Sequence, residues 1–343
     1  MAKILITGGA GFIGSNFVHK LLKNTEMDIF ILDSLTYAAN LRNLPENILL
    51  NTEKDRCQFF QGDIIDEGIV DDLVSKSDYI IHFAAETHVT RSIHDNKKFF
   101  ETEVIGTQRL ANATAKYKNK IKKFIHISTS EVYGTALTEA MNETHPLNPC
   151  SPYAAAKCGA DRLVYSYWHT YDLPMIIVRP FNNYGPRQHL EKVIPRFITS
   201  AILKEEIVIH GDGSAKRDYI YVDDLCNALI KLLELNEKNI FGEVINFGSG
   251  KDISVIEIAQ TIIDHLGSSV KITHVGDRPG QVARHTCDYQ KAKSLLNWEP
   301  LISWEEGIKR TIQWFVDNPQ NWQDQLWMRK VPIINLSGKK EFH

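Results

Sequence analysis

The sequence has no apolar run of the roughly 18–20 residues that a membrane-spanning helix requires. It also has no signal-peptide pattern, because the N-terminal segment "MAKILITGG" leads directly into the first expected strand. These absences exclude the sequence signatures of a membrane-spanning or secreted protein. We therefore expect a cytoplasmic protein without a membrane partner.

Cysteine is scarce and scattered. The 5 cysteines occupy positions 57, 150, 158, 226 and 287, with neither C-x-x-C spacing nor the pattern of a disulfide framework. This distribution is typical of reduced thiols in a cytoplasmic protein. No group of His, Cys and acidic residues has the spacing of metal ligands. We predict neither disulfides nor a metal site.

A concentrated basic surface is also missing, since the formal net charge of the 343 residues is -3. Nucleic acids and anionic membranes are bound by concentrated positive charge, so we expect neither as a partner. The sequence does contain 43% hydrophobic and 24% charged residues, which is typical of a globular chain with a sizeable core. Its length allows one large domain or two ordinary ones.

The first half of the sequence alternates short apolar runs with longer amphipathic segments. The apolar runs predict buried strands over residues 3–8, 29–33, 57–63, 79–85, 123–129 and 174–180. Helical periodicity predicts helices between several of these strands, over residues 12–24, 69–76, 96–117 and 153–171. Strands and helices in alternation favour the α/β class, here a Rossmann-like, doubly wound parallel sheet.

The pattern loosens after residue 180, where loops rich in proline, glycine and charge separate shorter elements. We expect residues 1–180 to form the Rossmann domain and residues 181–343 to form mainly a smaller C-terminal substrate-binding lobe. Part of residues 219–247 is expected to return to the Rossmann domain.

A glycine-rich turn follows the first expected strand. In "ILITGGAGFIGS", Gly8, Gly11 and Gly14 are spaced G-x-x-G-x-x-G between a strand and a helix, where they allow close approach of a pyrophosphate. The N–H groups at the start of that helix would face the phosphates. Asp33 ends the second strand, where an acid holds the adenosine ribose diol and repels a 2′-phosphate, and Asp63 ends the third, near the adenine. The domain over residues 1–180 is therefore predicted to bind NAD rather than NADP.

A tyrosine and a lysine stand four residues apart in "SPYAAAKCGAD", so Tyr153 and Lys157 share one face of a helix. A neighbouring ammonium and a cationic nicotinamide would both lower the pKa of the Tyr153 phenol. The phenolate would take a proton from a sugar hydroxyl while hydride leaves the carbon. Thr129 would hydrogen-bond the same hydroxyl. Combined with the glycine turn and Asp33, these residues indicate an enzyme.

On these residues the sequence resembles an extended short-chain dehydrogenase/reductase, and within that group a nucleotide-sugar 4,6-dehydratase of the dTDP-glucose type. The similarity covers nearly the whole chain. Segments such as "TGGAGFIGSNFV", "QGDI" and "SPYAAAK" are common to the superfamily, whereas "LTYAANL", "AAETHV" and "NNYGP" followed by "EKVIP" point to the dehydratase branch.

The resemblance implies a redox-neutral reaction on a nucleotide-diphosphate sugar. Tyr153 takes the 4-hydroxyl proton while NAD takes hydride from C4, and the resulting ketone acidifies the C5–H bond. Glu131 removes the C5 proton, water leaves from C6, and the hydride returns to C6 to give a 4-keto-6-deoxy sugar. The resemblance also implies a homodimer, through helices that include residues 99–117 and the Tyr153 helix.

Two positions depart from the dTDP-glucose pattern. Ser130 stands where these enzymes carry an aspartate that helps the 6-hydroxyl leave, and Thr90 stands where they usually carry another aspartate. A serine is a far weaker acid, although it can relay a proton or hydrogen-bond the departing oxygen. GDP-mannose dehydratases resemble this sequence in carrying serine, which leaves Glu131 to act as base and then as acid.

The main rival hypothesis is a nucleotide-hexuronate decarboxylase, in which the same "TSE" occurs and a β-keto acid loses carbon dioxide. Arg187 would hold such a carboxylate, although it could equally bind a phosphate or form a structural ion pair. Two further hypotheses are a 4-epimerase on the same fold and a non-catalytic NAD-binding sensor. The sensor would be free to lose Thr129, Tyr153 or Lys157, and all three are present.

The predicted site therefore has three parts. The catalytic residues are Thr129, Ser130, Glu131, Tyr153 and Lys157. The cofactor-binding residues are Gly8, Gly11, Phe12, Ile13, Gly14, Asp33, Asp63, Ile64, Ala84, Ala85, Tyr153 and Lys157. The substrate-binding residues are Glu86, His88, Asn182, Asn183, Arg187, Lys192, Arg217, Arg278 and Arg284. For each arginine in this set, a surface ion pair is the alternative role.

Overall fold

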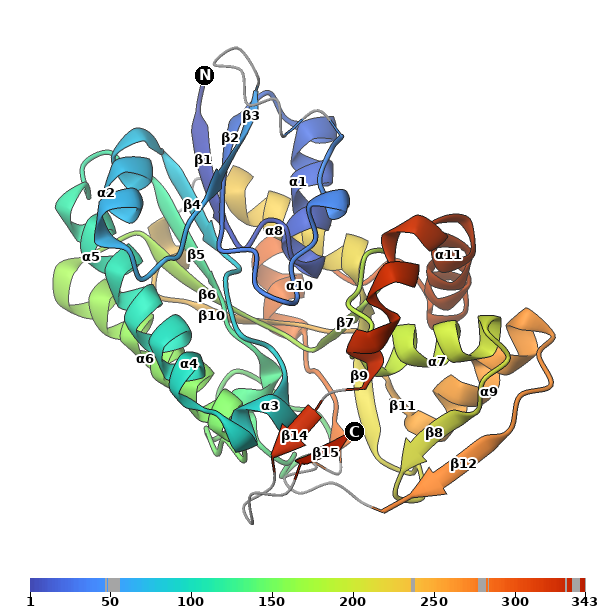
Figure 1. The fold of residues 1–343 in the computed structure, drawn as a ribbon. Helices are drawn as coiled ribbons and strands as arrows, with labels where there is room; N and C mark the ends of the chain where they lie inside the picture. The colour runs from blue at the N-terminus through green and yellow to red at the C-terminus, as the bar shows by residue number, and fades with distance from the viewer. Residues whose placement is uncertain are drawn as a thin grey trace.

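The computed structural model describes residues 1–46, 48, 56–235, 238–276, 282, 284–330, 332–334 and 340–342. Its centre is a 7-stranded sheet with the strand order β10-β6-β5-β4-β1-β2-β3 (Figure 1). All neighbouring strands in this sheet run parallel. The strands are β1 (Lys3–Thr7), β2 (Asp28–Asp33), β3 (Cys57–Gln61), β4 (Tyr79–His82), β5 (Lys123–Ile127), β6 (Met175–Pro180) and β10 (Val244–Phe247).

The central strands are buried on both faces because their sequences are almost continuously apolar. In β1 every residue after Lys3 is buried, and in β6 all residues are buried. A parallel sheet of this kind needs helices on both faces, and the long connections between its strands supply them. The strands predicted in the first 180 residues are confirmed, and β10 joins them from the second half of the chain.

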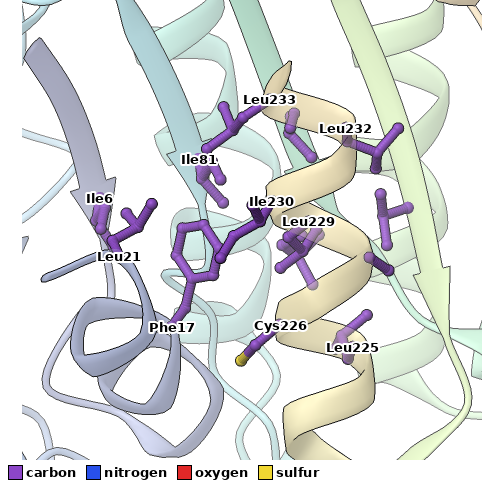
Figure 2. Packing of buried hydrophobic residues seen from close by; sticks show 14 of the residues in the cluster. Ile6, Phe17, Leu21, Ile81, Leu225, Cys226, Leu229, Ile230, Leu232 and Leu233 are labelled. Carbon is purple, nitrogen blue, oxygen red and sulfur yellow. The ribbon is translucent and has the colours of Figure 1, made fainter. Parts of the chain in front are cut away.

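Two layers of helices cover the sheet. One face carries α1 (Phe12–Asn24), α8 (Val222–Glu234) and α10 (Gln290–Leu296), and the other carries α2 (Glu67–Lys76), α5 (Thr107–Lys116) and α6 (Pro152–Tyr171). Figure 2 shows Phe17 of α1 beside Leu229 and Ile230 of α8, in the apolar layer over the sheet. Each such side chain stabilises the fold by about 1.5–3 kcal/mol when fully buried. Among the described helices, none is both long and apolar enough to cross a membrane.

A buried lysine fastens α8 to the sheet. Lys123 begins β5 and is only 4% exposed, and its Nζ donates to the carbonyl oxygens of Leu232 (2.5 Å), Leu233 (3.1 Å) and Leu235 (2.5 Å). Carbonyls at a helix C-terminus lack intrahelical partners, so a cation there satisfies them and complements the helix dipole. Burial lowers the pKa of Lys123 to about 8. The second half of the chain is thereby joined to the first.

The helix predicted over residues 96–117 is present but changes its winding. It begins as α4 (Lys97–Phe100), continues as the π-helical segment η3 (Glu101–Gly106) and ends as α5. Gly106 lies so close to Ile64 that a Cβ there would be 2.4 Å from the Cδ1 atom of Ile64. π-helical turns often occur at functional sites, and this one places Glu103 in the interior with no exposed surface.

The remaining elements form smaller sheets and helices beside the carboxyl ends of the central strands (Figure 1). One sheet has the order β11-β9-β13 with β7 paired to β9, and another is formed by β12 and β8. A third apolar core lies among them and includes Tyr184, Ile198, Ile262 and Phe315. These elements are β7 (Asn182–Tyr184), α7 (Val193–Ile202), β8 (Ile207–His210), β9 (Lys216–Tyr221), β11 (Asp252–Ser254), α9 (Val255–Leu266), β12 (Ile272–Val275), β13 (Arg284–His285) and α11 (Trp304–Asp317), followed by β14 (Pro332–Ile334) and β15 (Lys340–Phe342).

Candidate active site

A cavity of about 370 Å³ lies along the carboxyl ends of the central strands. Its walls include Gly8 after β1, Asp33 at the end of β2, Ala84 after β4 and Thr129 after β5. The strand order reverses between β1 and β4, so the chain leaves these two strands toward opposite faces and a crevice opens between the connections. Residues that follow β6, such as Asn182, line it as well.

Most predicted site residues line this cavity. They are Gly8, Gly11, Phe12, Ile13, Gly14, Asp33, Asp63, Ile64, Ala84, Ala85, Glu86, Thr129, Glu131, Tyr153, Lys157, Asn182, Asn183 and Lys192. The predicted residues that the structure describes but does not place in the lining are His88, Ser130, Arg187, Arg217 and Arg284. Arg278 lies outside the described residues.

The glycine turn is tight because its backbone segments are in contact. Gly8 has φ 72°, and a Cβ there would lie 2.6 Å from the backbone nitrogen of Ala84. A Cβ on Gly14 would lie 2.3 Å from the carbonyl oxygen of Gly8. Gly11 is the N-cap of α1 and provides no side-chain cap, so the first N–H groups of the helix remain available to an anion.

Asp33 is held by the backbone on both sides. Its Oδ2 accepts the N–H of Ala10 and its Oδ1 accepts the N–H of Leu35, each at 2.9 Å. Burial raises the pKa of Asp33, and these two hydrogen bonds lower it. A carboxylate oxygen can accept two hydrogen bonds, so Asp33 keeps acceptor capacity toward the cavity.

The segment after β5 brings the polar side chains to the cavity. Thr129 caps the short 3₁₀ helix η4 (Ser130–Tyr133), with its hydroxyl oxygen accepting the N–H of Glu131 at 3.2 Å. This turn directs the Glu131 side chain into the cavity lining, whereas Ser130 is 1% exposed and lies outside the lining. Ser130, predicted to be catalytic, is thus buried beside the lining in this structure.

Tyr153 and Lys157 lie one turn apart at the start of α6, which is capped by Ser151 and has Pro152 in its first turn. The Nζ of Lys157 donates to the carbonyl oxygen of Ile127 at 2.7 Å. The pKa of Tyr153 is raised by burial and further by the charge of Glu103, while a hydrogen bond with Thr129 lowers it. The sequence predicts a pKa lowered by Lys157, whereas the net shift of the Tyr153 pKa in this structure is a rise. The ammonium is instead held by a carbonyl and a carboxylate.

That carboxylate is Glu103, which sequence analysis missed. Its Oε2 lies 3.2 Å from the Nζ of Lys157, and its Oε1 accepts the N–H of Glu86 at 2.8 Å. Burial raises the pKa of Glu103 to about 7, and Lys157 opposes this shift. A signal was present in the sequence. Glu103 occupies the same helical stripe as the apolar residues Phe99, Gly106 and Leu110, where a charge must find a partner.

A histidine from the C-terminal half lies behind Glu131. The Nδ1 of His285, in β13, is 3.8 Å from the Oε1 of Glu131, and its Nε2 lies 2.6 Å from the carbonyl oxygen of Gly134. Sequence analysis missed His285, and no local motif marks it. Positions 131 and 285 are far apart in the chain, so only the fold brings the two residues together.

Of the arginines predicted to bind substrate, the structure describes Arg187, Arg217 and Arg284, and none of them is in the cavity lining. Arg187 donates to the Oδ1 of Asn16 in α1 at 2.9 Å, on the side of α1 and α8. Arg284 is paired with Asp252, and Arg217 lies beside it in the neighbouring strand β9. Arg187, predicted to hold a carboxylate or a phosphate or to form a structural contact, is hydrogen-bonded to Asn16 in this structure and has a positive φ of 68°.

His88 belongs to a buried cluster rather than to the cavity lining. It caps α3 (Val89–His94) by accepting the N–H of Arg91, and its Nε2 lies 3.8 Å from the Oε2 of Glu191. Glu191 also contacts His189 and accepts a hydrogen bond from Tyr37. The cavity is further lined by residues that were not predicted, among them Lys98, Gln188, His189 and Tyr219.

Within the described ranges, no group of three or more His, Cys, Asp or Glu side chains is arranged to hold a metal ion. The polar groups that line the cavity include hydroxyl, carboxylate, amide and ammonium groups. Close to strand β5, the lining includes the phenol of Tyr153, the ammonium of Lys157, the hydroxyl of Thr129 and the carboxylate of Glu131. At the other end, it includes the glycine turn and the carboxylate of Asp33.

The comparisons with known proteins agree with this geometry. The model of the GDP-mannose 4,6-dehydratase family matches residues 5–311. A relative from Haloferax volcanii, the low-salt glycan biosynthesis protein Agl12, is 44% identical over 92% of this chain and 99% of its own. A dTDP-glucose 4,6-dehydratase from Streptomyces niveus is 38% identical over 94% of this chain and 95% of its own. The solved structure of DesIV, a dTDP-glucose 4,6-dehydratase from Streptomyces venezuelae with NAD and TYD bound, is 37% identical, covers 94% of this chain and 99% of its own, and has a TM-score of 0.87.

Proposed function

The chain belongs to the GDP-mannose 4,6-dehydratase family of extended short-chain dehydrogenases/reductases and is an NAD-dependent nucleotide-sugar 4,6-dehydratase, and we propose that its substrate is dTDP-glucose. One observation carries the proposal. Glu131 lines the same cavity as Tyr153 and Thr129, so a base for C5 stands beside the groups that oxidise C4. The relatives named for dTDP-glucose support the choice of nucleotide and sugar.

The residues present fit NAD. A Cβ added to Gly11 would approach only the carbonyl oxygen of Gly8, at 3.3 Å, so the turn leaves its outer side open to a pyrophosphate. Asp33 would hold the adenosine ribose, and Tyr153 and Lys157 would face the nicotinamide half. When bound, NAD accepts the hydride from C4 and returns it to C6. We assign this binding to residues 1–180 with α8 and β10, and substrate binding mainly to the remaining elements.

Tyr153 is the proposed acceptor of the 4-hydroxyl proton. Because burial raises the pKa of Tyr153, its phenolate needs positive charge nearby at the moment of proton transfer. Lys157 stands one helical turn away and supplies an ammonium. Thr129, which is hydrogen-bonded to Tyr153, orients the same sugar hydroxyl.

Glu131 is the proposed base at C5, after oxidation at C4 has acidified that position. Its carboxylate is half-buried in the cavity lining. Among the described residues, the predicted arginines on the strands nearest to it are Arg217 of β9 and Arg284 of β13. A decarboxylase would need a cation for the substrate carboxylate and no base at C5. The hydrogen bond of Arg187 to Asn16, outside the cavity lining, supports the dehydratase over that rival.

For the substrate diphosphate we propose contacts from Lys192, Asn182 and Asn183, which line the cavity. The Nζ of Lys192 donates to the carbonyl oxygen of Thr87 at 2.8 Å, which fixes its ammonium near the mouth of the site. Arg217 and Arg284 lie on adjoining strands and are proposed to reach the outer phosphate.

We also propose a homodimer formed through the exposed side of the η3 and α6 region. Large apolar side chains are exposed there, including Phe100 (42%), Ile105 (39%) and Tyr171 (52%). Two such helices from each copy would form an interface that buries them. Analytical ultracentrifugation tests the proposal. We expect the wild type to sediment as a dimer and Ile105→Glu to sediment as a monomer. A wild type that sediments as a monomer would contradict the proposal.

The function is tested by incubating the purified protein with dTDP-glucose, UDP-glucose, GDP-mannose and UDP-glucuronate and weighing the products by mass spectrometry. We expect dTDP-glucose to lose one water without added NADH. Loss of carbon dioxide from UDP-glucuronate, with the neutral sugars untouched, would contradict the assignment and favour a decarboxylase. A product of unchanged mass whose NMR spectrum shows inversion at C4 would indicate an epimerase.

A further inference from the structure

Dehydration at C5 and C6 requires one group to remove a proton and one group to supply protons to the departing oxygen and to C5. After strand β5, Glu131 is the carboxyl group that enters the lining, while its neighbour Ser130 does not; Glu86, after strand β4, lines the cavity as well. A carboxylate that gives its proton to the departing 6-hydroxyl has none left to return to C5. A second proton-holding group in contact with Glu131 would reload it directly.

His285 has the position for this task. Its side chain is 1% exposed, and its Nδ1 is 3.8 Å from the Oε1 of Glu131. The carbonyl oxygen of Gly134 can only accept, so the Nε2 of His285 must carry a proton in that 2.6 Å hydrogen bond. In neutral His285 the Nδ1 is then an unprotonated acceptor, and among the described residues it has no hydrogen-bond partner. This Nδ1 atom faces the Glu131 carboxylate, and the described residues give it no other hydrogen-bonding group.

Resting on the proposed function, we propose that His285 is a positioning and proton-relay residue that shares a proton with Glu131 and thereby replaces a second carboxylic acid. Catalytic hydrogen bonds are often long before the reacting complex forms, so the 3.8 Å separation is compatible with transfer after a small side-chain shift.

The proton balance is as follows. Glu131 takes the C5 proton, the C5–H electron pair becomes the C5–C6 double bond, and the C6–O bond breaks as that oxygen takes the proton from Glu131 and leaves as water. His285, protonated on both nitrogens, then passes its Nδ1 proton to Glu131, which gives it to C5 as hydride reaches C6. Tyr153 releases the 4-hydroxyl proton to water, and His285 regains one from water. The net change is loss of one water.

The surroundings of His285 set how readily it carries that proton. Burial lowers its pKa, Glu131 raises it, Arg217 of β9 lowers it, the Gly134 carbonyl raises it and His145 lowers it. The relay should therefore be fully loaded only on the acid side of neutrality. We expect the return of hydride, read as the decay of NADH, to slow as pH rises through the range in which His285 loses its proton, which lies below the ordinary histidine range.

The test uses the holoenzyme, dTDP-glucose and stopped-flow measurement of NADH absorbance. His285→Gln places an amide N–H where Nε2 stands, so it keeps the bond to Gly134 and removes the group that faces Glu131. We expect NADH to form at the wild-type rate, to decay about 100-fold more slowly, and to lose the pH dependence of that decay. Glu131→Gln serves as the reference in which NADH forms and persists.

Other outcomes overturn the proposal. His285→Asn keeps a polar atom near Nδ1 and loses the hydrogen bond to Gly134. If NADH decays slowly in His285→Asn but at the wild-type rate in His285→Gln, His285 has a structural role only. Slow decay in Glu86→Gln with normal decay in His285→Gln would identify Glu86 as the acid. If the Gln variant does not fold, a pH-independent decay in the wild type would be decisive against the relay. No NADH in the wild type would instead refute the proposed function.

Discussion

The two ends of the cavity are built from different materials. At the cofactor end, the backbone forms the site: Gly8 and Gly14 allow segments to touch, Gly11 leaves the N-terminus of α1 uncapped, and Asp33 is fixed by two N–H groups. At the sugar end, buried ionisable side chains form the site in pairs. Apart from the Asp33 carboxyl, the groups at the cofactor end are backbone groups that do not titrate, whereas the sugar end depends on where several protons reside.

The pairs at the sugar end are Glu103 with Lys157 and Glu131 with His285. Neither pair comes from neighbouring positions in the sequence. A buried charge that loses its partner is costly, by about 3–5 kcal/mol. Single substitutions at the sugar end are therefore expected to change both the reaction and the stability of the fold. Comparing them with substitutions at the cofactor end distinguishes the two ends experimentally.

The largest effect is expected from Tyr153→Phe. Phenylalanine keeps the ring contact with Phe99, whose centroid is 6.3 Å away, but it cannot accept the 4-hydroxyl proton. We expect turnover of dTDP-glucose to fall about 1000-fold with NAD affinity nearly unchanged. Tyr165→Phe, on the exposed side of the same helix, is the matched control and should retain activity. Retained turnover in Tyr153→Phe would remove the tyrosine from the mechanism.

Next in size is Asp33→Asn at the cofactor end. The amide keeps the shape but loses the charge, and its NH₂ group opposes one of the two N–H donors from Ala10 and Leu35. We expect the dissociation constant for NAD to rise about 10-fold, with weaker discrimination against NADP. Calorimetric titration measures both, and Asp66→Asn, which changes the cap of α2, is the control. Unchanged affinity would mean that Asp33 only braces the turn.

Glu103→Gln should change how stability depends on pH. Burial raises the pKa of Glu103 from 4.5 to about 7, so between these values the folded state holds a proton that the unfolded state has released. Its contribution to the free energy of unfolding therefore falls as pH rises through this window, by about 1.4 kcal/mol per unit. The variant should gain stability relative to the wild type between about pH 5 and about pH 7.

Urea unfolding at both pH values measures that difference. Glu101→Gln is the control, because Glu101 lies in the same π-helical segment but is exposed beside Lys97. Parallel pH profiles for the wild type and Glu103→Gln would show that Glu103 is already ionised throughout.

The smallest effect is expected from Arg187→Ala. Its guanidinium donates to Asn16 outside the cavity lining, so we expect kcat and KM to stay within about twofold and stability to fall by about 1 kcal/mol. Steady-state kinetics and thermal unfolding check this. A large rise in KM would return Arg187 to the substrate site and revive the decarboxylase hypothesis.

Sequence patterns located the cofactor end because its residues follow regular elements at fixed spacings. Gly8, Asp33 and Tyr153 each stand at the end of a strand or the start of a helix, so short-range rules place them. The fold class followed from the same alternation of strands and helices. The exact elements differ mainly where the helix over 96–117 widens at η3, which apolar periodicity does not reveal.

The sugar end could be predicted only in part because its contacts are long-range. Ser130 and Glu131 lie in one 3₁₀ turn capped by Thr129, and of the two only Glu131 lines the cavity. Arg187 is hydrogen-bonded to Asn16, 171 residues away in the chain. His285 reaches Glu131 only because β13 pairs with β9. Such placements follow from tertiary packing rather than from local sequence.

The most direct test of a redox-neutral dehydratase is the fate of the hydrogen on C4. The protein would be incubated with dTDP-glucose carrying deuterium at C4, and the product examined by NMR. We predict that the deuterium is found in the methyl group at C6 of a 4-keto product, with no NADH added. Deuterium that remains on C4, or that is lost to an added hydride acceptor, would contradict the account.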